Sequence, residues 1–303
     1  MSTTKRALLI GCNYSNDPAN RLYGCINDVI HMSNTLVDAF DYDMNNITML
    51  RDDTTIPSIL PTRANILSEL NKLVQMSSKL TEIWIHYSGH GSQVKDANGD
   101  EMDGLDEVIV PSNFKSAGCI TDDEIFEVLK KIYVRCRVVL LFDSCHSGSV
   151  CDLAYMFQTN GTSAALGKKM LVHPNIYCFS GCKDPQTSAD AYSSVENRAV
   201  GAFSYIFLYC LRKNNFNVDV FKLYADICKT ILQNGFEQTP QFSCSSSKPN
   251  MVFGRYTFRD TATLKNPMPN LLRAPITVVK QTTIFPVVKT NRKPSMNMVV
   301  VIA

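Results

Sequence analysis

Two short polar segments combine the residue types that cysteine hydrolysis needs. Residues 86–93 (HYSGHGSQ) place His90 between two glycines, and residues 143–148 (DSCHSG) place Cys145 close to Asp143. Each segment follows an apolar run that is typical of a buried strand. A cysteine hydrolase requires a thiolate nucleophile, an imidazole that exchanges its proton, and backbone N–H donors for the developing oxyanion. Adjacent parallel strands that end at His90 and Cys145 could supply all three beside one cleft.

Other interpretations of these residues compete with hydrolysis. His86 and His90 have the i, i+4 spacing of a helical zinc pair, but the Ser-Gly between them and the preceding strand pattern argue against a helix. His86 lies within the strand pattern and is predicted to be a core or hydrogen-bonded histidine. The Gly-His-Gly turn lacks the context of a nucleotide-binding loop. A buried cysteine is most often a small apolar filler, which is our expectation for most of the eleven cysteines.

The elements that must position these residues alternate along the chain. Short apolar runs predict strands at Ala7–Gly11, Ile47–Leu50, Glu82–Tyr87, Val138–Phe142 and Asn175–Phe179. Helical periodicity predicts helices at Asn27–Phe40, Arg63–Met76, Asp122–Tyr133, Gly201–Leu211 and Val218–Gln233. This alternation predicts an α/β fold with a mostly parallel central sheet and helices on both faces. Ligands of such sheets bind beyond the carboxyl ends of the strands, where both polar segments are expected to lie.

Composition divides the chain into four segments. Residues 1–158 form the larger part of the predicted catalytic domain, and residues 175–256 form the smaller part. Between them, residues 159–174 are rich in Gly, Ser, Thr and Ala and contain Lys168 and Lys169, which predicts an exposed linker open to cleavage. Residues 257–303 carry prolines between short β-branched runs, which predicts an extended or disordered basic tail.

Charge, hydropathy and cysteine usage exclude several classes of protein. The net charge is +2, but from residue 261 onward the chain has six basic and no acidic residues, so the preceding part is mildly acidic. We therefore expect no nucleic-acid partner. No apolar run approaches the roughly 18 residues of a membrane span, and the start of the chain lacks the pattern of a secretory signal. Eleven cysteines without zinc-finger spacing favour reduced thiols in a cytoplasmic protein.

The motifs together resemble those of the metacaspases, within the caspase-like cysteine peptidases. The interval between His90 and Cys145 is close to the separation of about 50 residues in caspases. Three further motifs match, at residues 23–28 (YGCIND), 118–123 (GCITDD) and 180–190 (SGCKDPQTSAD). The similarity extends from Lys5 to about Tyr256. The Pro/Gln-rich prodomain common in type I members is missing, and the basic tail matches no pattern of the family.

The resemblance implies roles for individual residues. It implies His90 as general base and acid, Cys145 as nucleophile, and a primary specificity pocket lined by Cys25, Asp28, Ser88 and Asp143. Two carboxylates next to a nucleophile would hold an Arg or Lys side chain, whereas cleavage after Asp would need basic residues there. Asp143 could instead orient His90 as the third member of a triad, and this alternative stays open.

The acidic stretch at residues 96–107 (DANGDEMDGLDE) carries six carboxylates, a density that usually marks a solvated loop. An EF-hand is rejected because Glu101 occupies the position at which its loop needs glycine. The resemblance instead implies a calcium site on Asp106, Asp122, Asp123 and Asp152, whose oxygens suit a hard cation. The alternative is that these residues are plain surface acids or N-caps of the helix predicted from Asp122.

Residues and resemblance together predict a calcium-activated cysteine endopeptidase that cleaves protein or peptide substrates after Arg or Lys. We expect a monomer that cuts its own linker at Lys168 or Lys169, with the N–H groups of Gly91 and Cys145 as oxyanion donors. One rival hypothesis is a catalytically silent caspase-like scaffold for protein interactions. Another is a transition-metal protein that uses His86, His90, Cys145 and His146.

Overall fold

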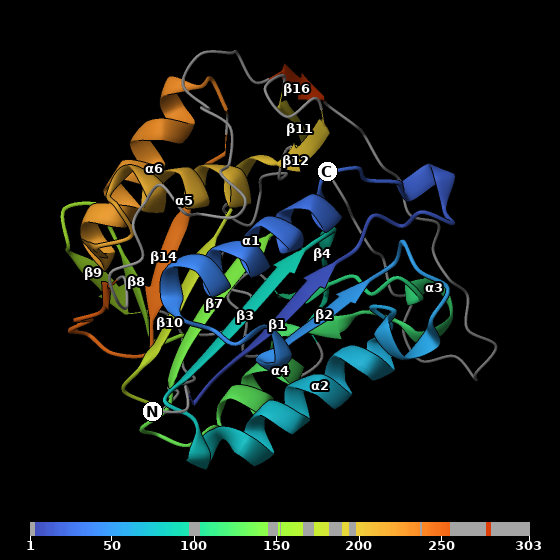
Figure 1. The fold of residues 1–303 in the computed structure, drawn as a ribbon, viewed down its shortest axis with the longest axis horizontal. Coiled ribbons are helices and arrows are strands. Elements are labelled where there is room, and N and C mark those ends of the chain that lie inside the picture. The colour runs from blue at the N-terminus through green and yellow to red at the C-terminus, as the bar shows by residue number, and fades with distance from the viewer. Residues whose placement is uncertain are drawn as a thin grey trace.

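The centre of the fold is an eight-stranded mixed sheet with helices on both of its faces (Figure 1). The structure is a computed structural model that describes residues 4–96, 104–144, 151, 153–165, 173–181, 190–193, 198–236, 238–254 and 277–279. The strand order is β2-β1-β3-β7-β10-β14-β8-β9. Neighbouring strands from β2 to β10 run parallel, and the remaining pairs run antiparallel. The predicted α/β fold with a mostly parallel sheet is confirmed.

The elements of the described residues have the following bounds. The main sheet contains β1 (Lys5–Gly11), β2 (Ile47–Arg51), β3 (Glu82–Ser88), β7 (Arg137–Asp143), β8 (Tyr155–Phe157), β9 (Ser163–Ala165), β10 (Ile176–Ser180) and β14 (Gln241–Cys244). The helices are α1 (Cys25–Phe40), α2 (Arg63–Met76), α3 (Phe114–Ala117), α4 (Asp122–Leu129), α5 (Ala202–Lys213) and α6 (Val220–Gln233). Smaller sheets contain β4 (Gly91–Lys95), β5 (Leu105–Ile109) and β6 (Ile120–Thr121); β11 (Asp190–Ser193), β12 (Arg198–Gly201) and β16 (Thr277–Val279); and β13 (Val218–Asp219) with β15 (Val252–Phe253).

Side chains of the central strands alternate between two hydrophobic cores, because successive strand residues point to opposite faces of a sheet. On one face, Leu9 and Trp84 pack with side chains of α1, α5 and α6. On the other face, Leu8 and Ile85 pack with side chains of α2 and α4. Burial on both faces explains why β1, β3 and β7 are nearly continuous apolar runs in the sequence.

Helix boundaries follow from capping. The hydroxyl of Thr62 accepts the N–H of Asn65 at 3.2 Å, so α2 begins where the sequence predicts. Thr121 and Glu124 form a capping box that starts α4. Helix α1 begins two residues earlier than predicted, because the side-chain oxygen of Asn13 accepts the N–H of Cys25 at 3.0 Å. A cap supplied from a distant part of the chain leaves no local signal.

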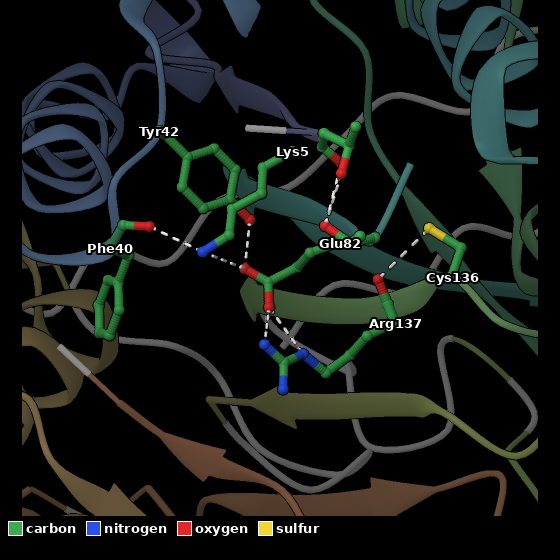
Figure 2. Close-up of polar contacts among 8 residues, drawn as sticks. Lys5, Phe40, Tyr42, Glu82, Cys136 and Arg137 are labelled. Atoms are coloured by element: carbon green, nitrogen blue, oxygen red, sulfur yellow. Dashed lines mark hydrogen bonds and ion pairs between the residues drawn. The ribbon is translucent and has the colours of Figure 1, made fainter. Parts of the chain in front are cut away.

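The first residues of three neighbouring strands form a buried charge network (Figure 2). Glu82 accepts hydrogen bonds from the Tyr42 hydroxyl, at 2.7 Å, and from the Arg137 guanidinium. The Nζ atom of Lys5 lies 3.9 Å from Oε1 of Glu82 and donates to the carbonyl of Phe40 at 2.8 Å. Burial lowers the pKa of Lys5. Paired opposite charges therefore lie at the amino edge of the sheet, where β1, β3 and β7 begin.

Two strands lie in segments for which the sequence predicts no strand. Asp106 and Glu107, expected in a solvated loop, lie on β5 and are only 4% and 2% exposed. Thr277–Val279, in the predicted tail, forms β16 and pairs with β11. Both strands are held by backbone hydrogen bonds to partners distant in sequence, which local composition does not report.

The predicted linker begins with a strand. Ser163–Ala165 forms β9, an exposed edge strand of the main sheet that pairs with β8. Lys168 and Lys169 lie outside the described residues, and the cleavable linker stays a prediction.

Two properties of the cysteines and helices can be stated for the described part of the chain. The nine cysteines there are free thiols. No helix among these residues is long and apolar enough to cross a membrane.

Candidate active site

The candidate residues gather at the carboxyl ends of β3 and β7, which are adjacent and parallel. Ser88 and Asp143 are the last residues of these strands and lie opposite each other. His90 follows β3 and directly precedes β4, which begins at Gly91. Cys145 lies outside the described residues, two positions beyond the end of β7. The adjacency expected of the two strands is confirmed, and it brings His90 to the edge from which Cys145 continues.

The His90 imidazole is buried and oriented by a backbone carbonyl. His90 is only 6% exposed, and its Nε2 atom lies 2.8 Å from the carbonyl oxygen of Asn20. Because a carbonyl can only accept, Nε2 carries the proton in the neutral ring and Nδ1 carries the lone pair. Burial lowers the pKa of His90 to about 4, so the ring is neutral at physiological pH. The Asn20 carbonyl thus occupies the position of a triad acceptor, which disfavours Asp143 in that role.

Two buried carboxylates converge on Gly201, which immediately precedes α5. Asp28 accepts the Ser88 hydroxyl at 2.7 Å and the Gly201 N–H at 2.9 Å. Asp143 accepts the Ser204 N–H at 2.8 Å. A Cβ atom at Gly201 would lie 2.3 Å from an oxygen of Asp143 and 2.4 Å from one of Asp28. The structure therefore brings three of the four expected pocket residues together.

These carboxylates also serve the first turn of α5. Gly201, the N-cap, has no side chain with which to accept the helix N–H groups, and Asp28 and Asp143 accept them from other elements. The helix N-terminus in turn favours negative charge at this position. Asp28 and Asp143 therefore have a structural role, and the hydrogen bonds from Gly201 and Ser204 hold their carboxylate oxygens in a defined geometry.

The remaining pocket residue, Cys25, is the first residue of α1 and is 4% exposed. It lies three positions before Asp28, a spacing that places both residues on one helix face. Asn13 fixes the start of this helix through the N–H of Cys25.

Three of the four carboxylates of the expected calcium site, those of Asp106, Asp122 and Asp123, lie on β5 and at the start of α4. Asp106 and Asp122 are 4% and 1% exposed. Asp122 accepts the N–H of Glu107 at 3.2 Å and that of Asp123 at 2.8 Å. The alternative of plain surface acids is wrong for Asp106 and Asp122 because both are buried, and the N-cap of α4 is Thr121.

Oxygen donors of this kind suit calcium, and three of the four expected ligands come from β5 and the start of α4. The fourth, Asp152, lies outside the described residues. Within the ranges that the structure describes, no group of three or more His, Cys, Asp or Glu side chains is placed to hold a metal ion. The chemistry of the donors fits calcium, and the site stays a prediction.

His86 is a hydrogen-bonded core histidine, as the sequence predicts. It is fully buried on β3, and its Nε2 lies 3.0 Å from the Ser204 hydroxyl. Burial lowers the pKa of His86 to about 3. Because β3 is a strand, His86 and His90 do not share the helix face that a zinc pair would need. Of the transition-metal hypothesis, Cys145 and His146 lie outside the described residues.

Comparison with known proteins decides the family. The family described as "Metacaspase, peptidase C14 domain" matches residues 5–154. Metacaspase-1A of Aspergillus oryzae is 36% identical over an alignment of 299 positions, and the match covers 82% of this chain and 70% of that protein. Metacaspase-1 of Schizosaccharomyces pombe is 35% identical over an alignment of 290 positions, and the match covers 80% of this chain and 67% of that protein. This chain belongs to the metacaspase family.

Solved structures share the fold of this metacaspase. The crystal structure of Caspase-1 from Spodoptera frugiperda has a TM-score of 0.55 at 11% identity, covering 84% of this chain and 90% of that one. A Geobacter sulfurreducens protein has a TM-score of 0.54 at 22% identity, covering 86% and 96%. The fold is caspase-like, and the family makes this metacaspase a cysteine-type endopeptidase with protein substrates.

The site of the metacaspase contains several residues for which the sequence predicts no role. Asn20 contributes a backbone carbonyl, and Gly201 and Ser204 contribute backbone N–H groups, so their side chains carry no signal for these roles. The ring of Tyr14 packs against that of His90 in a tilted arrangement, with ring centroids 4.8 Å apart. Only the folding of residues 12–24 over the carboxyl edge of the sheet brings Tyr14 and Asn20 to His90.

Proposed function

We propose that this cysteine endopeptidase cleaves peptide bonds after Arg or Lys with Cys145 as nucleophile and His90 as base and acid, and that calcium activates it. The observation that carries the specificity is the convergence of Asp28 and Asp143 at the carboxyl edge of the sheet. The burial and orientation of His90 beside the end of β7 support its role in proton transfer.

The proposed chemistry is acyl transfer through a thioester. Nδ1 of His90 takes the proton of the Cys145 thiol, and the thiolate attacks the scissile carbonyl carbon. The N–H groups of Gly91 and Cys145 stabilise the oxyanion, and the imidazolium gives its proton to the leaving amine. A water molecule then loses a proton to His90 and attacks the thioester, which releases the acid and restores the thiol.

The proposed specificity follows from charge. A guanidinium can donate to two carboxylates at once, and an ammonium can lie between them, so Asp28 and Asp143 would bind Arg and Lys side chains. A substrate Asp at the same position would be repelled by both groups. The Ser88 hydroxyl holds Asp28 at this position.

The decisive experiment is a panel of fluorogenic peptides with Arg, Lys or Asp before the scissile bond, measured with and without calcium. We expect hydrolysis after Arg and Lys and none after Asp. Preference for Asp would overturn the specificity. A purified, folded protein that hydrolyses none of them with calcium would favour the silent scaffold.

The proposed calcium site consists of Asp106, Asp122, Asp123 and Asp152, and a bound ion would neutralise carboxylates buried at the start of α4. We expect chelator to remove most of the activity, and Asp122→Asn to weaken the calcium dependence strongly. Asp100→Asn, in the acidic stretch but outside the proposed set, is the matched control and is expected to respond like wild type. Full activity in chelator would refute calcium activation.

Self-cleavage at Lys168 or Lys169 is a further part of the proposal. The test is intact-mass analysis after incubation with calcium for wild type, Cys145→Ala and the Lys168→Ala/Lys169→Ala double variant. We expect a fragment that ends at one of these lysines from wild type alone. The same fragment from Cys145→Ala would indicate a contaminating protease.

A further inference from the structure

The backbone of His90 is held from both sides by two buried tyrosine hydroxyls. The His90 N–H donates to the Tyr14 hydroxyl at 3.0 Å, and the Tyr87 hydroxyl donates to the His90 carbonyl at 2.7 Å. Both hydroxyls also bond to Val110: Tyr14 donates to its carbonyl at 2.6 Å, and Tyr87 accepts its N–H at 3.1 Å. A Cβ atom at Gly89 would lie 2.6 Å from the Tyr87 hydroxyl, so glycine is required there. These bonds define where the backbone of His90 lies.

Tyr14 differs from Tyr87 because it also contacts the imidazole. The ring centroids of Tyr14 and His90 lie 4.8 Å apart at an interplanar angle of 34°, and Tyr14 is 2% exposed. The Tyr87 ring instead packs against Phe142, with centroids 6.4 Å apart. Tyr14 therefore covers a face of the imidazole and contributes to the burial that lowers the pKa of His90 to about 4.

The backbone of Tyr14 adopts a left-handed conformation, with φ of 51°. A bulky residue in this region is strained and needs support from its surroundings. The support comes from Asp52, which follows β2 and is 8% exposed. Its carboxylate accepts the N–H groups of Asn13, at 2.8 Å, and Ser15, at 3.2 Å, on both sides of Tyr14. Burial raises the pKa of Asp52.

The loop that carries Tyr14 makes a further contact with His90 through Asn20. The N–H of Asp17 donates to the Tyr14 carbonyl at 2.8 Å, and the N–H of Asn20 donates to the Asp17 carbonyl at 3.0 Å. These consecutive turns connect Tyr14 to the Asn20 carbonyl that binds Nε2 of His90. The loop of residues 14–20 thus makes three contacts with His90: with the imidazole ring, with its Nε2 atom and with the backbone N–H of the residue.

We propose that Tyr14 is a positioning residue for His90 and that Asp52 holds Tyr14 in the conformation that this requires. The proposal rests on the proposed role of His90 as base and acid. Tyr14 acts through His90: it fixes the plane of the imidazole relative to the Asn20 carbonyl, and it excludes water from one face of the ring.

Four variants separate ring, hydroxyl and anchor. Tyr14→Leu removes both ring and hydroxyl, Tyr14→Phe removes the hydroxyl alone, and Asp52→Asn weakens the anchor. Tyr87→Phe is the matched control, because it removes a hydroxyl from the same backbone contacts without touching the imidazole. The measurements are kcat, KM, the pH profile of kcat/KM on a peptide that wild type cleaves, and the melting temperature.

We expect Tyr14→Leu to lower kcat by about 10- to 100-fold with KM within about 2-fold, since misplacement of a reacting group by about 1 Å can cost 10²-fold. Access of water raises the pKa of His90, so the acid limb of kcat/KM moves to higher pH. Among the described residues, Asp17 is the charged group that acts on the pKa of His90; it is paired with Lys115 at 2.6 Å and is unchanged in these variants. Asp52→Asn should move the same limb by a smaller amount.

Tyr14→Phe should lower kcat less, by about 3- to 10-fold, and leave the acid limb in place, because the ring remains. Tyr87→Phe should also leave the limb in place. A folded Tyr14→Leu variant with wild-type kcat and pH profile would overturn the proposal. An equal shift of the limb in Tyr87→Phe would overturn it as well, because the effect would then be general loosening.

A second measurement does not depend on turnover. Imidazole ¹⁵N resonances of His90, recorded across pH in a Cys145→Ala background, report its pKa and tautomer directly. Tyr14→Leu should raise the titration midpoint and weaken the preference for the Nε2–H form, and unchanged resonances would refute the placement by Tyr14. Full activity of His90→Ala would instead refute the proposed function and leave this measurement valid.

Discussion

Buried polar groups lie at both ends of the central strands, at the amino edge, where β1, β3 and β7 begin, and at the carboxyl edge, where these strands end, and the two edges are built differently. At the amino edge, Glu82 is bound by the cations of Lys5 and Arg137 (Figure 2). At the carboxyl edge, Asp28 and Asp143 accept from neutral donors, a serine hydroxyl and backbone N–H groups. A cation cancels the charge of a carboxylate locally, whereas a neutral donor stabilises a carboxylate without cancelling its charge. The ion pairs at the amino edge therefore suit stability, and the neutral donors at the carboxyl edge are compatible with the proposed binding of an Arg or Lys side chain.

The largest effect is expected at the carboxyl edge, where substitution should remove activity without unfolding the protein. Cys145→Ala and His90→Ala should lower kcat/KM by at least about 10⁴-fold, because the residues of a nucleophile–base unit act together. Their melting temperatures should stay within a few degrees of wild type. Cys151→Ala, a buried cysteine outside the proposed chemistry, is the control and should retain activity. Turnover by Cys145→Ala would remove Cys145 as nucleophile.

The next effect distinguishes the two acidic residues of the carboxyl edge from structural caps. Asp28→Asn and Asp143→Asn keep an oxygen that can accept the α5 N–H groups but lose the charge. We expect kcat/KM for Arg and Lys peptides to fall by about 10²-fold, since an unpaired cation in a desolvated pocket costs several kcal/mol. Unfolding free energies should change little. If stability falls and cleavage does not, the capping role alone explains these residues.

Substitution at the amino edge should have the opposite effect: it should lower the unfolding free energy and leave kcat/KM unchanged. Glu82→Gln removes the carboxylate that Lys5 and Arg137 share, and loss of one member of a buried ion pair costs about 3 kcal/mol of unfolding free energy. Denaturant melts measure this loss, and kcat/KM at 25 °C should stay near wild type. Lys130→Gln, which breaks an exposed pair with Glu127, is the control and should change the free energy by less than about 1 kcal/mol. Equal losses of unfolding free energy in Glu82→Gln and Lys130→Gln would contradict the contrast between the two edges.

A further effect is a pH dependence of stability that comes from the two buried histidines, His86 on β3 and His90 after β3. Folding lowers the pKa of His86 to about 3 and of His90 to about 4 from 6.5, so the unfolded chain binds more protons below pH 6.5. Their contribution is fully present above pH 6.5 and is lost as pH falls toward 4, on the order of a few kcal/mol. His86→Asn should flatten this slope in melts between pH 7 and pH 4. An unchanged slope would show that His86 is not buried as a neutral ring.

The sequence predicts the parts of the fold that local patterns determine. The apolar runs of β1, β3 and β7 and the periodicity of α2 specify those elements because each is buried through its own side chains. It does not predict β4 and β5, whose short polar segments are held by backbone pairing across an intervening stretch. At the site, side-chain chemistry indicates His90, and the family resemblance indicates Asp28. The carbonyl of Asn20 and the left-handed conformation of Tyr14 depend on tertiary contacts, so no local pattern indicates them.

The order of strands in the main sheet has a mechanical consequence. Strands β10 and β14 lie between β7 on one side and β8 on the other, although β7 and β8 both precede them in the chain. If the chain were severed between β9 and β10, the later piece would be enclosed by the earlier one and hydrogen-bonded to it along two borders. The later piece could leave only by rupturing both borders at once. Separately made pieces would have to insert rather than add at an edge, so the intact fold must form before any cut.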